Sequence, residues 1–505
     1  MSSWSRAAVG AALGAALGGW AVAALTPRDF SVGTFQDDAQ YAVLAKSIRE
    51  EHGYRNLNFP GHPPELKFAP GWPAVLALAW KPGASGAANL ERLRWVNLIL
   101  VGPLAGVVAV AGMQVFGLPA LLSAVVAVAS VASPAEQTWW AIPMSEPLCL
   151  ALLALGLILA TGGRFRGAAT SLAAAIYVRS IAAPFLVALV VVAAWKHGWK
   201  RAVQPALIGL ALLAPWIVHV FANRHAVPPV LAGAGYGSYA AFYGQGLLAD
   251  PVTMLVTVPL VNAPMIVQAV GQALLGWHWA PRAVELVLGL AIAGLVARSG
   301  RSRPVFWVGL GLYVLTVLLW PFPQEDRFVG SVWPLLLLAV LAALPWPRVR
   351  WGLVCVATLT ATLGFAQAKG IERHRQRSRG SLALLDSLRT RIPPGKLVAT
   401  SNPPFVYLRL GNPTMVSWRE RSYRWYREGY WAGAWGLGDD LWAIIRAYDP
   451  DYLIIERRGA EGRYAAGSLI RQCPGVLEQV WGTPGGEFLF AVHGGVSCAP
   501  TVTKQ

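Results

Sequence analysis

Charged residues are scarce in this chain. Only 13% of its 505 residues are Asp, Glu, Lys or Arg, whereas 55% are hydrophobic. Soluble domains carry about a quarter charged residues. Apolar runs of roughly 20 residues, the length that spans a bilayer core, recur from Ala7 to Phe365. The composition therefore excludes an ordinary soluble enzyme and predicts a polytopic α-helical membrane protein.

Several motifs that would define a chemistry are also absent. The sequence contains no Walker loop, no dinucleotide-binding glycine pattern, no zinc-ligand spacing and no Ser-His-Asp order. Its four cysteines define no disulfide framework. Cys149 and Cys355 lie in apolar runs, whereas Cys473 and Cys498 lie near the C-terminus and are able to pair if that region is extracytoplasmic.

Acidic residues are fewer than basic ones, and the net charge is +17. The basic residues fall in short clusters between apolar runs, which is the positive-inside pattern of membrane proteins and not a nucleic-acid surface. We therefore expect no nucleic-acid partner and a cytoplasmic location for the clusters. These are Arg164 and Arg166; Lys196, Lys200 and Arg201; Arg298, Arg301 and Arg303; and Arg348 and Arg350.

This charge pattern predicts eleven spans within an expected total of about 11–13, with the N-terminus inside. The first run also resembles a signal peptide, but helix parity favours an uncleaved span. Residues 71–80 are too short to cross and predict an interfacial helix. Residues 252–275 are long enough, but crossing conflicts with the charge pattern, so they are either re-entrant or paired with a misjudged span. The expected spans are 7–26, 96–115, 118–133, 147–162, 168–179, 181–195, 202–221, 283–298, 304–321, 329–345 and 350–366.

The same topology places most remaining acids on the outer face. The loop with Asp37 and Asp38, the loop 134–146 and the loop 321–327 all fall there, as does the Gly- and Tyr-rich stretch 223–250. Acids that lie away from basic clusters therefore gather on one side of the predicted bilayer.

The composition changes after Lys369. A charged stalk at 373–379 precedes alternating strand and helix patterns, with strands expected at 396–400, 414–418 and 451–456 and helices at 404–410 and 440–447. We therefore expect a transmembrane domain over 1–369 and an extracytoplasmic α/β domain over 370–505. Its aromatic stretch, which includes Trp425, Tyr430, Trp431 and Trp435, suits either sugar stacking or a headgroup-level belt.

Asp37 and Asp38 are the candidate catalytic residues. An Asp at this place is also a good N-cap for the predicted helix 39–50, and we expect one of the two to have that role. One carboxylate is suited to take a proton from an acceptor hydroxyl. The other is suited to orient the site or to bind a metal, so a divalent cation is left open and no other cofactor is expected.

The remaining candidates would bind substrate. Lys67 and Arg327 are cations at the depth of a lipid phosphate, although each also suits a snorkelling role. Glu146 begins a predicted span and also suits interaction with the helix dipole. Arg179 lies between two apolar runs on the outer side. Tyr41 and His62 complete the set, with a polar loop role as the alternative for His62.

The order of these motifs resembles the GT-C glycosyltransferases. Asp37-Asp38-Ala39-Gln40-Tyr41-Ala42 is similar to their first-loop signature, and Pro63-Pro64 leads into an interfacial helix as it does there. Ser145-Glu146-Pro147 resembles a second acidic loop, and Arg327-Phe328 a late Arg-aromatic motif. The closest group is the family-39-like enzymes, which include protein O-mannosyltransferases and lipid A aminoarabinose transferases.

This resemblance implies an inverting hexosyl- or pentosyltransferase in the bacterial inner membrane. It implies a polyprenyl-phosphate-sugar donor, a glycan, lipid or protein acceptor outside the cytoplasm, and a catalytic carboxylate at Asp37 within the first outer loop, 27–95. Asp38 stands where many members have glutamate.

Two other classes remain as alternatives. A lipid or solute transporter or flippase would carry acids in mid-span and inverted repeats, neither of which the sequence shows. A non-catalytic polysaccharide-assembly partner is the third. An outward cavity lined by Asp37, Glu146 and Arg327 would favour the enzyme.

Overall fold

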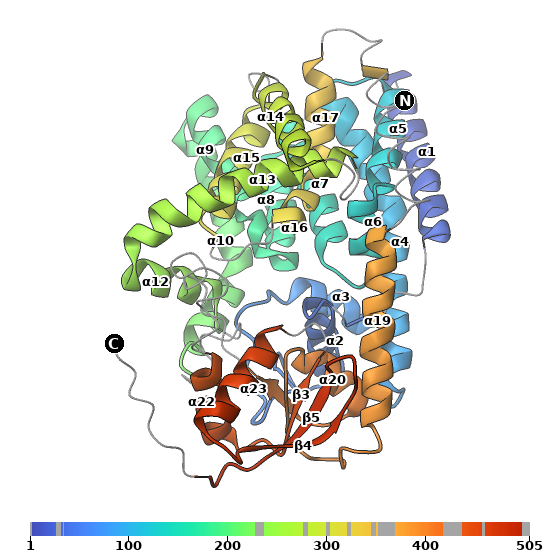
Figure 1. The fold of residues 1–505 in the computed structure, drawn as a ribbon. Helices are drawn as coiled ribbons and strands as arrows, with labels where there is room; N and C mark the ends of the chain where they lie inside the picture. The colour runs from blue at the N-terminus through green and yellow to red at the C-terminus, as the bar shows by residue number, and fades with distance from the viewer. Residues whose placement is uncertain are drawn as a thin grey trace.

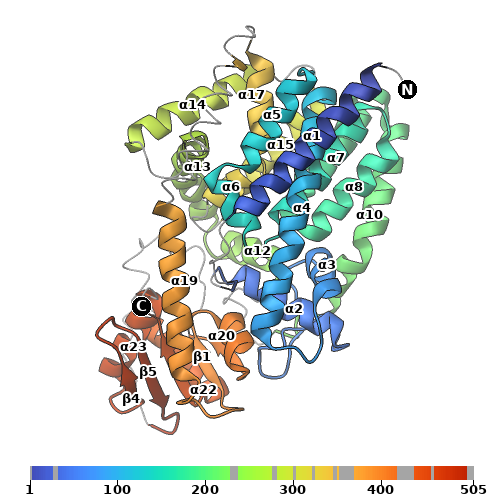
Figure 2. The same ribbon diagram turned by 90° about the vertical axis from the view of Figure 1, so that its right-hand side faces the viewer.

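The structure is a computed structural model that describes residues 3–26, 32–33, 35–227, 237–275, 281–298, 303–320, 325–344, 350–351, 369–417, 437–456 and 460–496. Within these ranges most residues are helical and form a bundle, and a small region with a β-sheet lies at one end of it (Figures 1 and 2).

Small residues let the first helices of the bundle pack closely. α1 (Ser3–Leu25) runs along α4 (Gly86–Gln114). A β-carbon on Gly19 would meet the Val101 carbonyl at 2.9 Å, so the two backbones nearly touch there. The Trp20 ring lies where a side chain at Gly102 would be. Close approach of this kind is how helices associate without a hydrophobic driving force in lipid.

The other helices of the bundle follow in chain order, and the predicted spans up to 329–345 each coincide with one of them. Five described helices are long and apolar enough to cross a membrane by length and composition, and several others are shorter. The last predicted span, 350–366, lies almost wholly outside the described residues. The bounds are α5 (Ala120–Val131), α6 (Pro134–Trp140), α7 (Glu146–Thr161), α8 (Phe165–Val178), η1 (Ser180–Ala182), α9 (Ala183–His197), α10 (Trp199–Ala222), α12 (Tyr239–Ala249), η2 (Thr253–Thr257), α13 (Val258–Leu275), α14 (Arg282–Arg298), α15 (Pro304–Leu318), α16 (Glu325–Gly330) and α17 (Trp333–Ala343).

Residues 252–275, for which the charge pattern left two alternatives, form one continuous helical stretch. The π-turn η2 leads directly into α13, and residues Thr253–Leu274 are among the five membrane-length helices. α13 runs at a steep angle to α1 and α4 (Figure 1). It packs along α14, where a β-carbon on Gly271 or Gly289 would collide with the backbone of the facing helix.

Two helices fill the segment between α1 and α4. α2 (Asp37–Arg49) and α3 (Gly71–Ala79) correspond to the predicted helices at 39–50 and 71–80. α2 is nearly all buried, from Asp38 to Ala45 and again at Ser47. Figure 1 shows both helices between the bundle and the C-terminal region. The first loop is therefore a packed layer and not an open connection.

The C-terminal region begins with α19 (Lys369–Leu388) and forms a five-stranded sheet in the order β2-β1-β3-β5-β4. β1 pairs in parallel with β2 and β3, whereas β5 pairs antiparallel with β3 and β4. The predicted strands and helices of this region are all present, with shifted ends. α23, β4 and β5 were not predicted. β4 has one buried position, so its apolar signal is weak. The bounds are β1 (Val398–Thr400), α20 (Pro403–Leu410), β2 (Thr414–Val416), α22 (Leu437–Tyr448), β3 (Tyr452–Ile455), α23 (Ala460–Gln472), β4 (Leu477–Gly482) and β5 (Phe488–Val492).

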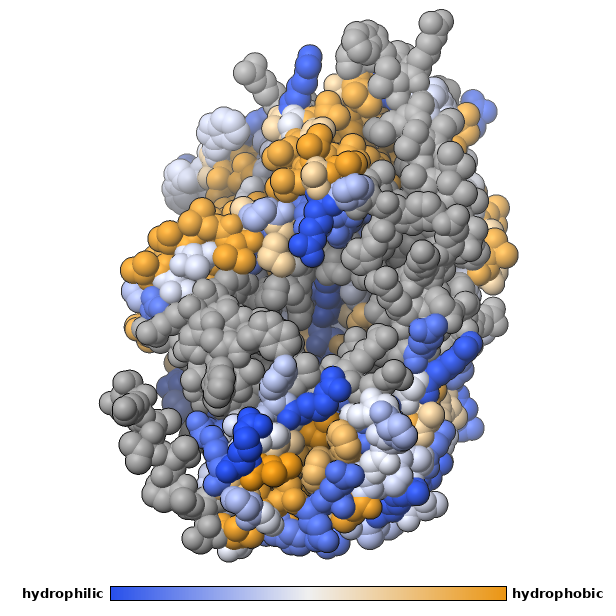
Figure 3. All heavy atoms as spheres, in the orientation of Figure 1, coloured by the Kyte–Doolittle hydropathy of each residue, from blue (hydrophilic) through white to orange (hydrophobic). Residues whose placement is uncertain are grey.

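The two regions differ in their surface. Figure 3 shows hydrophobic residues over α13 and α14 and mixed, mainly hydrophilic residues over the C-terminal sheet and its helices. Cys473 in this region is disulfide-bonded, and Cys149 in α7 is free and buried. Cys498 and the aromatic stretch with Trp425, Tyr430, Trp431 and Trp435 lie outside the described residues.

The contact between α13 and α14 gives a test of the helix packing. Gly289→Ala places a methyl group against the Val267 carbonyl, whereas Gly294→Ala, on the same helix, meets nothing within 4 Å. Both substitutions gain helix propensity of up to about 1 kcal/mol. We expect overpacking to outweigh this gain at Gly289 and to cost about 1–3 kcal/mol. Thermal unfolding in detergent should show a lower Tm for Gly289→Ala alone; equal Tm values would contradict the described packing.

Candidate active site

Asp37 and Asp38 stand side by side at the start of α2 but have different surroundings. Asp38 is fully buried, and its carboxylate accepts from the backbone N–H of Gly33 (2.5 Å) and of Phe35 (3.1 Å). Burial raises its pKa to about 6, against the lowering effect of these backbone bonds. Gln36 is the N-cap residue, and no side chain caps α2. The expectation of an aspartate N-cap is therefore wrong, because Asp38 reaches back to the preceding turn instead.

Arg327 connects Asp37 to a second carboxylate. Its Nη1 donates to Asp37 Oδ2 at 2.5 Å, and its Nε donates to Glu146 Oε1 at 2.6 Å. The Asp37 side chain keeps 20% of its surface exposed, whereas that of Glu146 keeps 1%. Asp37 is therefore the carboxylate that a substrate is able to reach, and Glu146 is the one that holds the guanidinium in place.

Arg179 completes the group by pairing with the same Glu146 oxygen. We name Asp37, Glu146, Arg179 and Arg327 the arginine–carboxylate cluster. Its formal charges are two negative and two positive, so the cluster is neutral as a whole. Burying one ion is costly, and a buried charge persists when an opposite charge compensates it.

All four members lie at one end of the bundle. Glu146 is the first residue of α7, Arg179 follows the last residue of α8, and Arg327 lies in α16 between α15 and α17. Arg164 precedes α8, whose 14 residues separate it from Arg179 by about 21 Å. The basic cluster with Arg164 and the arginine–carboxylate cluster thus occupy opposite ends of the same helix.

Hydrogen bonds from neighbouring elements fix the loop that carries Glu146. Tyr41 of α2 bonds to Ser145 (Oη to Oγ, 3.1 Å), the residue before Glu146. Trp72 of α3 donates from Nε1 to the Pro143 carbonyl (2.9 Å). Asn97 of α4 donates to the carbonyls of Trp139, Ile142 and Met144. Each of these buried bonds would cost about 1–3 kcal/mol to leave unmade, so the segment between α1 and α4 is locked to the loop that carries Glu146.

Lys67 and His62 lie outside the cluster. The Lys67 ammonium sits 5.2 Å from the centre of the Phe68 ring, and that ring packs edge-on against Tyr41, with 5.0 Å between centroids. Two aromatic rings, Phe68 and Tyr41, thus lie between Lys67 and Ser145, the residue before Glu146. His62 occupies an exposed turn, where its carbonyl accepts from Arg55 (3.1 Å). Among the described residues it bonds to no member of the cluster.

The structure adds residues that the sequence analysis did not select. Tyr239 is the first residue of α12. Burial raises its pKa, and the negative charge of nearby Asp37 raises it further. The Trp139 ring lies 5.9 Å from the Arg327 guanidinium. Glu136 is 3% exposed, and burial followed by the Glu146 charge raises its pKa well above the ordinary range. Trp139 and Glu136 belong to the predicted outer loop 134–146. Their place in that loop was the feature of the sequence that could have selected them as site residues.

Among the described residues, no group of potential metal ligands lies at the arginine–carboxylate cluster. No group there of three or more His, Cys, Asp or Glu side chains is arranged to hold a metal ion. The oxygens of Asp37 and Glu146 that face the cluster bind guanidinium groups instead. Arginine offers a planar fork of donors, and in this cluster the donors of Arg179 and Arg327 bind carboxylates.

The arrangement of these helices matches that of solved membrane enzymes. Archaeal oligosaccharyltransferase AglB from Archaeoglobus fulgidus, solved with an inhibitory peptide and a dolichol-phosphate, superposes with a TM-score of 0.53. The match covers 96% of this chain and 74% of AglB at 12% identity. The fold is of the GT-C type. The expectation of a GT-C-like helical membrane protein with a small C-terminal α/β region is confirmed.

Two crystal structures of ArnT from Cupriavidus metallidurans also match. The one bound to undecaprenyl phosphate is 14% identical, with a TM-score of 0.46 over 97% of this chain and 98% of ArnT. The apo structure is 13% identical, with a TM-score of 0.43 over 90% of this chain and 93% of ArnT. No protein-family model and no curated protein sequence matches this chain.

The pairing within the cluster gives a stability prediction. Glu146→Gln keeps the side-chain size but leaves two arginines facing an amide. Breaking a buried ion pair in this way costs about 3–5 kcal/mol. Glu478→Gln makes the same charge change at an exposed pair with His493, where we expect less than about 1 kcal/mol. A Tm in detergent that falls equally in both variants, or in neither, would contradict the described burial.

Proposed function

We propose that the protein is an inverting glycosyltransferase that moves a sugar from a polyprenyl phosphate to an acceptor hydroxyl. The observation that carries this proposal is the bridge from Arg327 to both Asp37 and Glu146. It supplies a partly exposed carboxylate next to a cation that is held for anion binding. The GT-C fold supports the assignment as an analogy at the level of architecture.

In the transfer step, Asp37 acts as the base and the phosphate is the leaving group. Asp37 takes the proton from the acceptor hydroxyl, and the hydroxyl oxygen attacks the anomeric carbon from the side opposite the phosphate. The bond between that carbon and the phosphate oxygen breaks, so the configuration inverts. The leaving group changes from a phosphodiester with one negative charge to a monoester that carries close to two.

The cluster compensates for that change in charge. When Asp37 becomes protonated, the neutral cluster acquires one net positive charge at the moment the phosphate gains one negative charge. Arg327 faces Asp37, so a phosphate that binds Arg327 also competes with Asp37 and frees this carboxylate to act as a base. Fixed cations that meet charge as it develops are a large contribution to catalysis in many enzymes.

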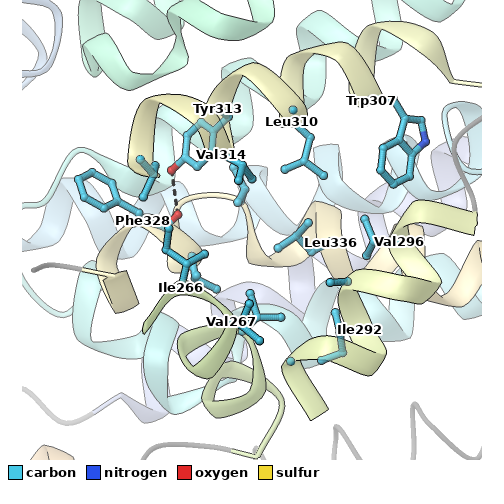
Figure 4. A pocket seen from close by; sticks show the side chains of 17 residues that line it. Ile266, Val267, Ile292, Val296, Trp307, Leu310, Tyr313, Val314, Phe328 and Leu336 are labelled. Carbon is cyan, nitrogen blue, oxygen red and sulfur yellow. Dashed lines mark hydrogen bonds between the residues drawn. The ribbon is translucent and has the colours of Figure 1, made fainter. Parts of the chain in front are cut away.

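An apolar cavity beside Arg327 suits the lipid part of the donor. It has a volume of about 350 Å³ and is lined by residues of α13, α14, α15, α16 and α17. Phe328, the neighbour of Arg327, lines it, and its carbonyl accepts from the Tyr313 hydroxyl at 2.8 Å (Figure 4). We assign this cavity to the isoprenoid chain next to the phosphate. The size is within the range of about 300–1,000 Å³ for small-molecule sites.

AglB was solved in complex with a dolichol-phosphate, which supports a polyprenyl-phosphate carrier for this chain as well. We place the reaction on the outer face of the bacterial inner membrane, because the basic cluster with Arg164 and the arginine–carboxylate cluster lie at opposite ends of α8. We assign residues 1–369 to the transmembrane domain, with the catalytic loop at 27–95, and residues 370–505 to an extracytoplasmic domain. The disulfide at Cys473 suits that location.

The base is tested by Asp37→Asn. The lipid-linked sugar that accumulates in a deletion strain is identified by mass spectrometry, purified, and used as the donor with purified protein. We expect Asp37→Asn to lower the transfer rate by about 100-fold or more, since a general base contributes 10²–10⁴-fold. Its Tm should fall less than that of Glu146→Gln, because Asp37 is partly exposed. Asp439→Asn, at an exposed position of α22, is the matched control. Full transfer by Asp37→Asn would refute the mechanism.

The anion site is tested by Arg327→Lys, which keeps the charge and removes the fork. We expect the Kd for undecaprenyl phosphate in nanodiscs to rise about tenfold, which is 1.4 kcal/mol. Arg471→Lys, in the last turn of α23, should leave the Kd unchanged. An unaltered Kd for Arg327→Lys would place the phosphate elsewhere.

A further inference from the structure

The C-terminal region touches the turn that precedes α2. Asn402, which lies between β1 and α20, donates from Nδ2 to the Gly33 carbonyl at 2.9 Å, and this bond is buried. The Phe405 ring of α20 occupies the place where a β-carbon of Gly33 would be. Gly33 has φ = 106°, a conformation that glycine adopts without strain. Two side chains of the sheet region therefore hold one glycine of the first loop.

That glycine is tied in turn to Asp38. Gly33 N–H and Phe35 N–H both donate to the Asp38 carboxylate, and Asp37 N–H donates to the Phe35 carbonyl at 2.8 Å. Gln36 has φ = 69°, which is uncommon for a residue with a side chain. Such backbone persists where the surrounding contacts over-determine it. The turn is thus held from both sides, by Asn402 on one and Asp38 on the other.

The contacts form one path from the sheet region to the cluster. Asn402 holds Gly33, Gly33 and Phe35 hold Asp38, and Asp38 is adjacent to Asp37, which pairs with Arg327. We propose that Asn402 is a positioning residue for Asp37, so that docking of the C-terminal region sets the place of the catalytic carboxylate. This inference rests on the proposed role of Asp37 as the base.

Other contacts keep the two regions docked without Asn402. Thr414 N–H donates to the Asn58 carbonyl at 2.7 Å, and the Lys46 ammonium donates to the Tyr407 hydroxyl at 3.0 Å. Phe59 packs edge-on against Tyr448, with 5.9 Å between ring centroids. Loss of the Asn402 bond should therefore loosen the turn without separating the regions. An experiment on Asn402 can therefore distinguish a role in positioning Asp37 from a role in docking the two regions.

The test compares Asn402→Ala with Tyr407→Phe. Both remove one hydrogen bond across the same interface, but only Asn402 contacts the turn. We expect Asn402→Ala to lower the transfer rate about 10- to 100-fold, since displacement of a reacting group by about 1 Å costs this much. The Kd for undecaprenyl phosphate should stay within about twofold, and Tyr407→Phe should keep both values. Hydrogen exchange of the peptide covering α2 and the preceding turn should be faster in Asn402→Ala alone.

Gly33→Ala is a second variant, which changes the turn itself. Its methyl group would collide with the Phe405 ring and is disfavoured at this φ. We expect it to lower transfer and to speed exchange in the same peptide, again with an unchanged Kd.

Two outcomes overturn the inference: full transfer by Asn402→Ala despite faster exchange, or an equal loss in Tyr407→Phe, which would mean that docking alone matters. If Asp37→Asn stays active, the proposed function fails instead. If Asp37→Asn is inactive and Asn402→Ala is fully active, the positioning role alone is refuted.

Discussion

The bridge from Arg327 to two carboxylates constrains much of the described structure. One guanidinium bonds to Asp37 of the first loop and to Glu146 at the start of α7, while Arg179 bonds to the same Glu146. Each of these groups comes from a different element, so the ends of α2, α7, α8 and α16 must converge at one point. A largely buried arginine with no carboxylate beside it would be strongly unfavourable. The cost of separating these charges keeps the helix ends together.

That convergence depends on rigid loops. Neutral hydrogen bonds from Tyr41, Trp72 and Asn97 fix the connection that carries Glu146, and backbone bonds to Asp38 fix the turn that carries Asp37. The two adjacent aspartates thus divide their roles by environment. Asp38 is enclosed and holds its own backbone, whereas Asp37 keeps an exposed edge. Chemical identity alone does not distinguish them; burial does.

The membrane region and the sheet region meet at the same first loop. The bundle supplies cations at its helix ends and an apolar cavity beside them, and the sheet region contacts the turn before the acids through Asn402 and Phe405. An enzyme that handles a lipid carrier and a water-soluble or surface acceptor needs elements in both environments. In the proposed reaction, the lipid-linked donor and the acceptor would meet at the first loop, which lies between the two regions.

The sequence by itself determined the class of fold, the positions of most helices and the common side of Asp37, Glu146, Arg179 and Arg327. It did so because bilayer length and the bias of basic residues act on local stretches of chain. It also determined the core of the C-terminal α/β pattern, but not β4, whose burial is slight. Only the tertiary structure decided that Arg327 bridges Asp37 and Glu146, that Asp38 turns away, and that Lys67 and His62 lie aside. Those outcomes depend on contacts between residues as far as 290 positions apart, which no local pattern of hydropathy or charge encodes.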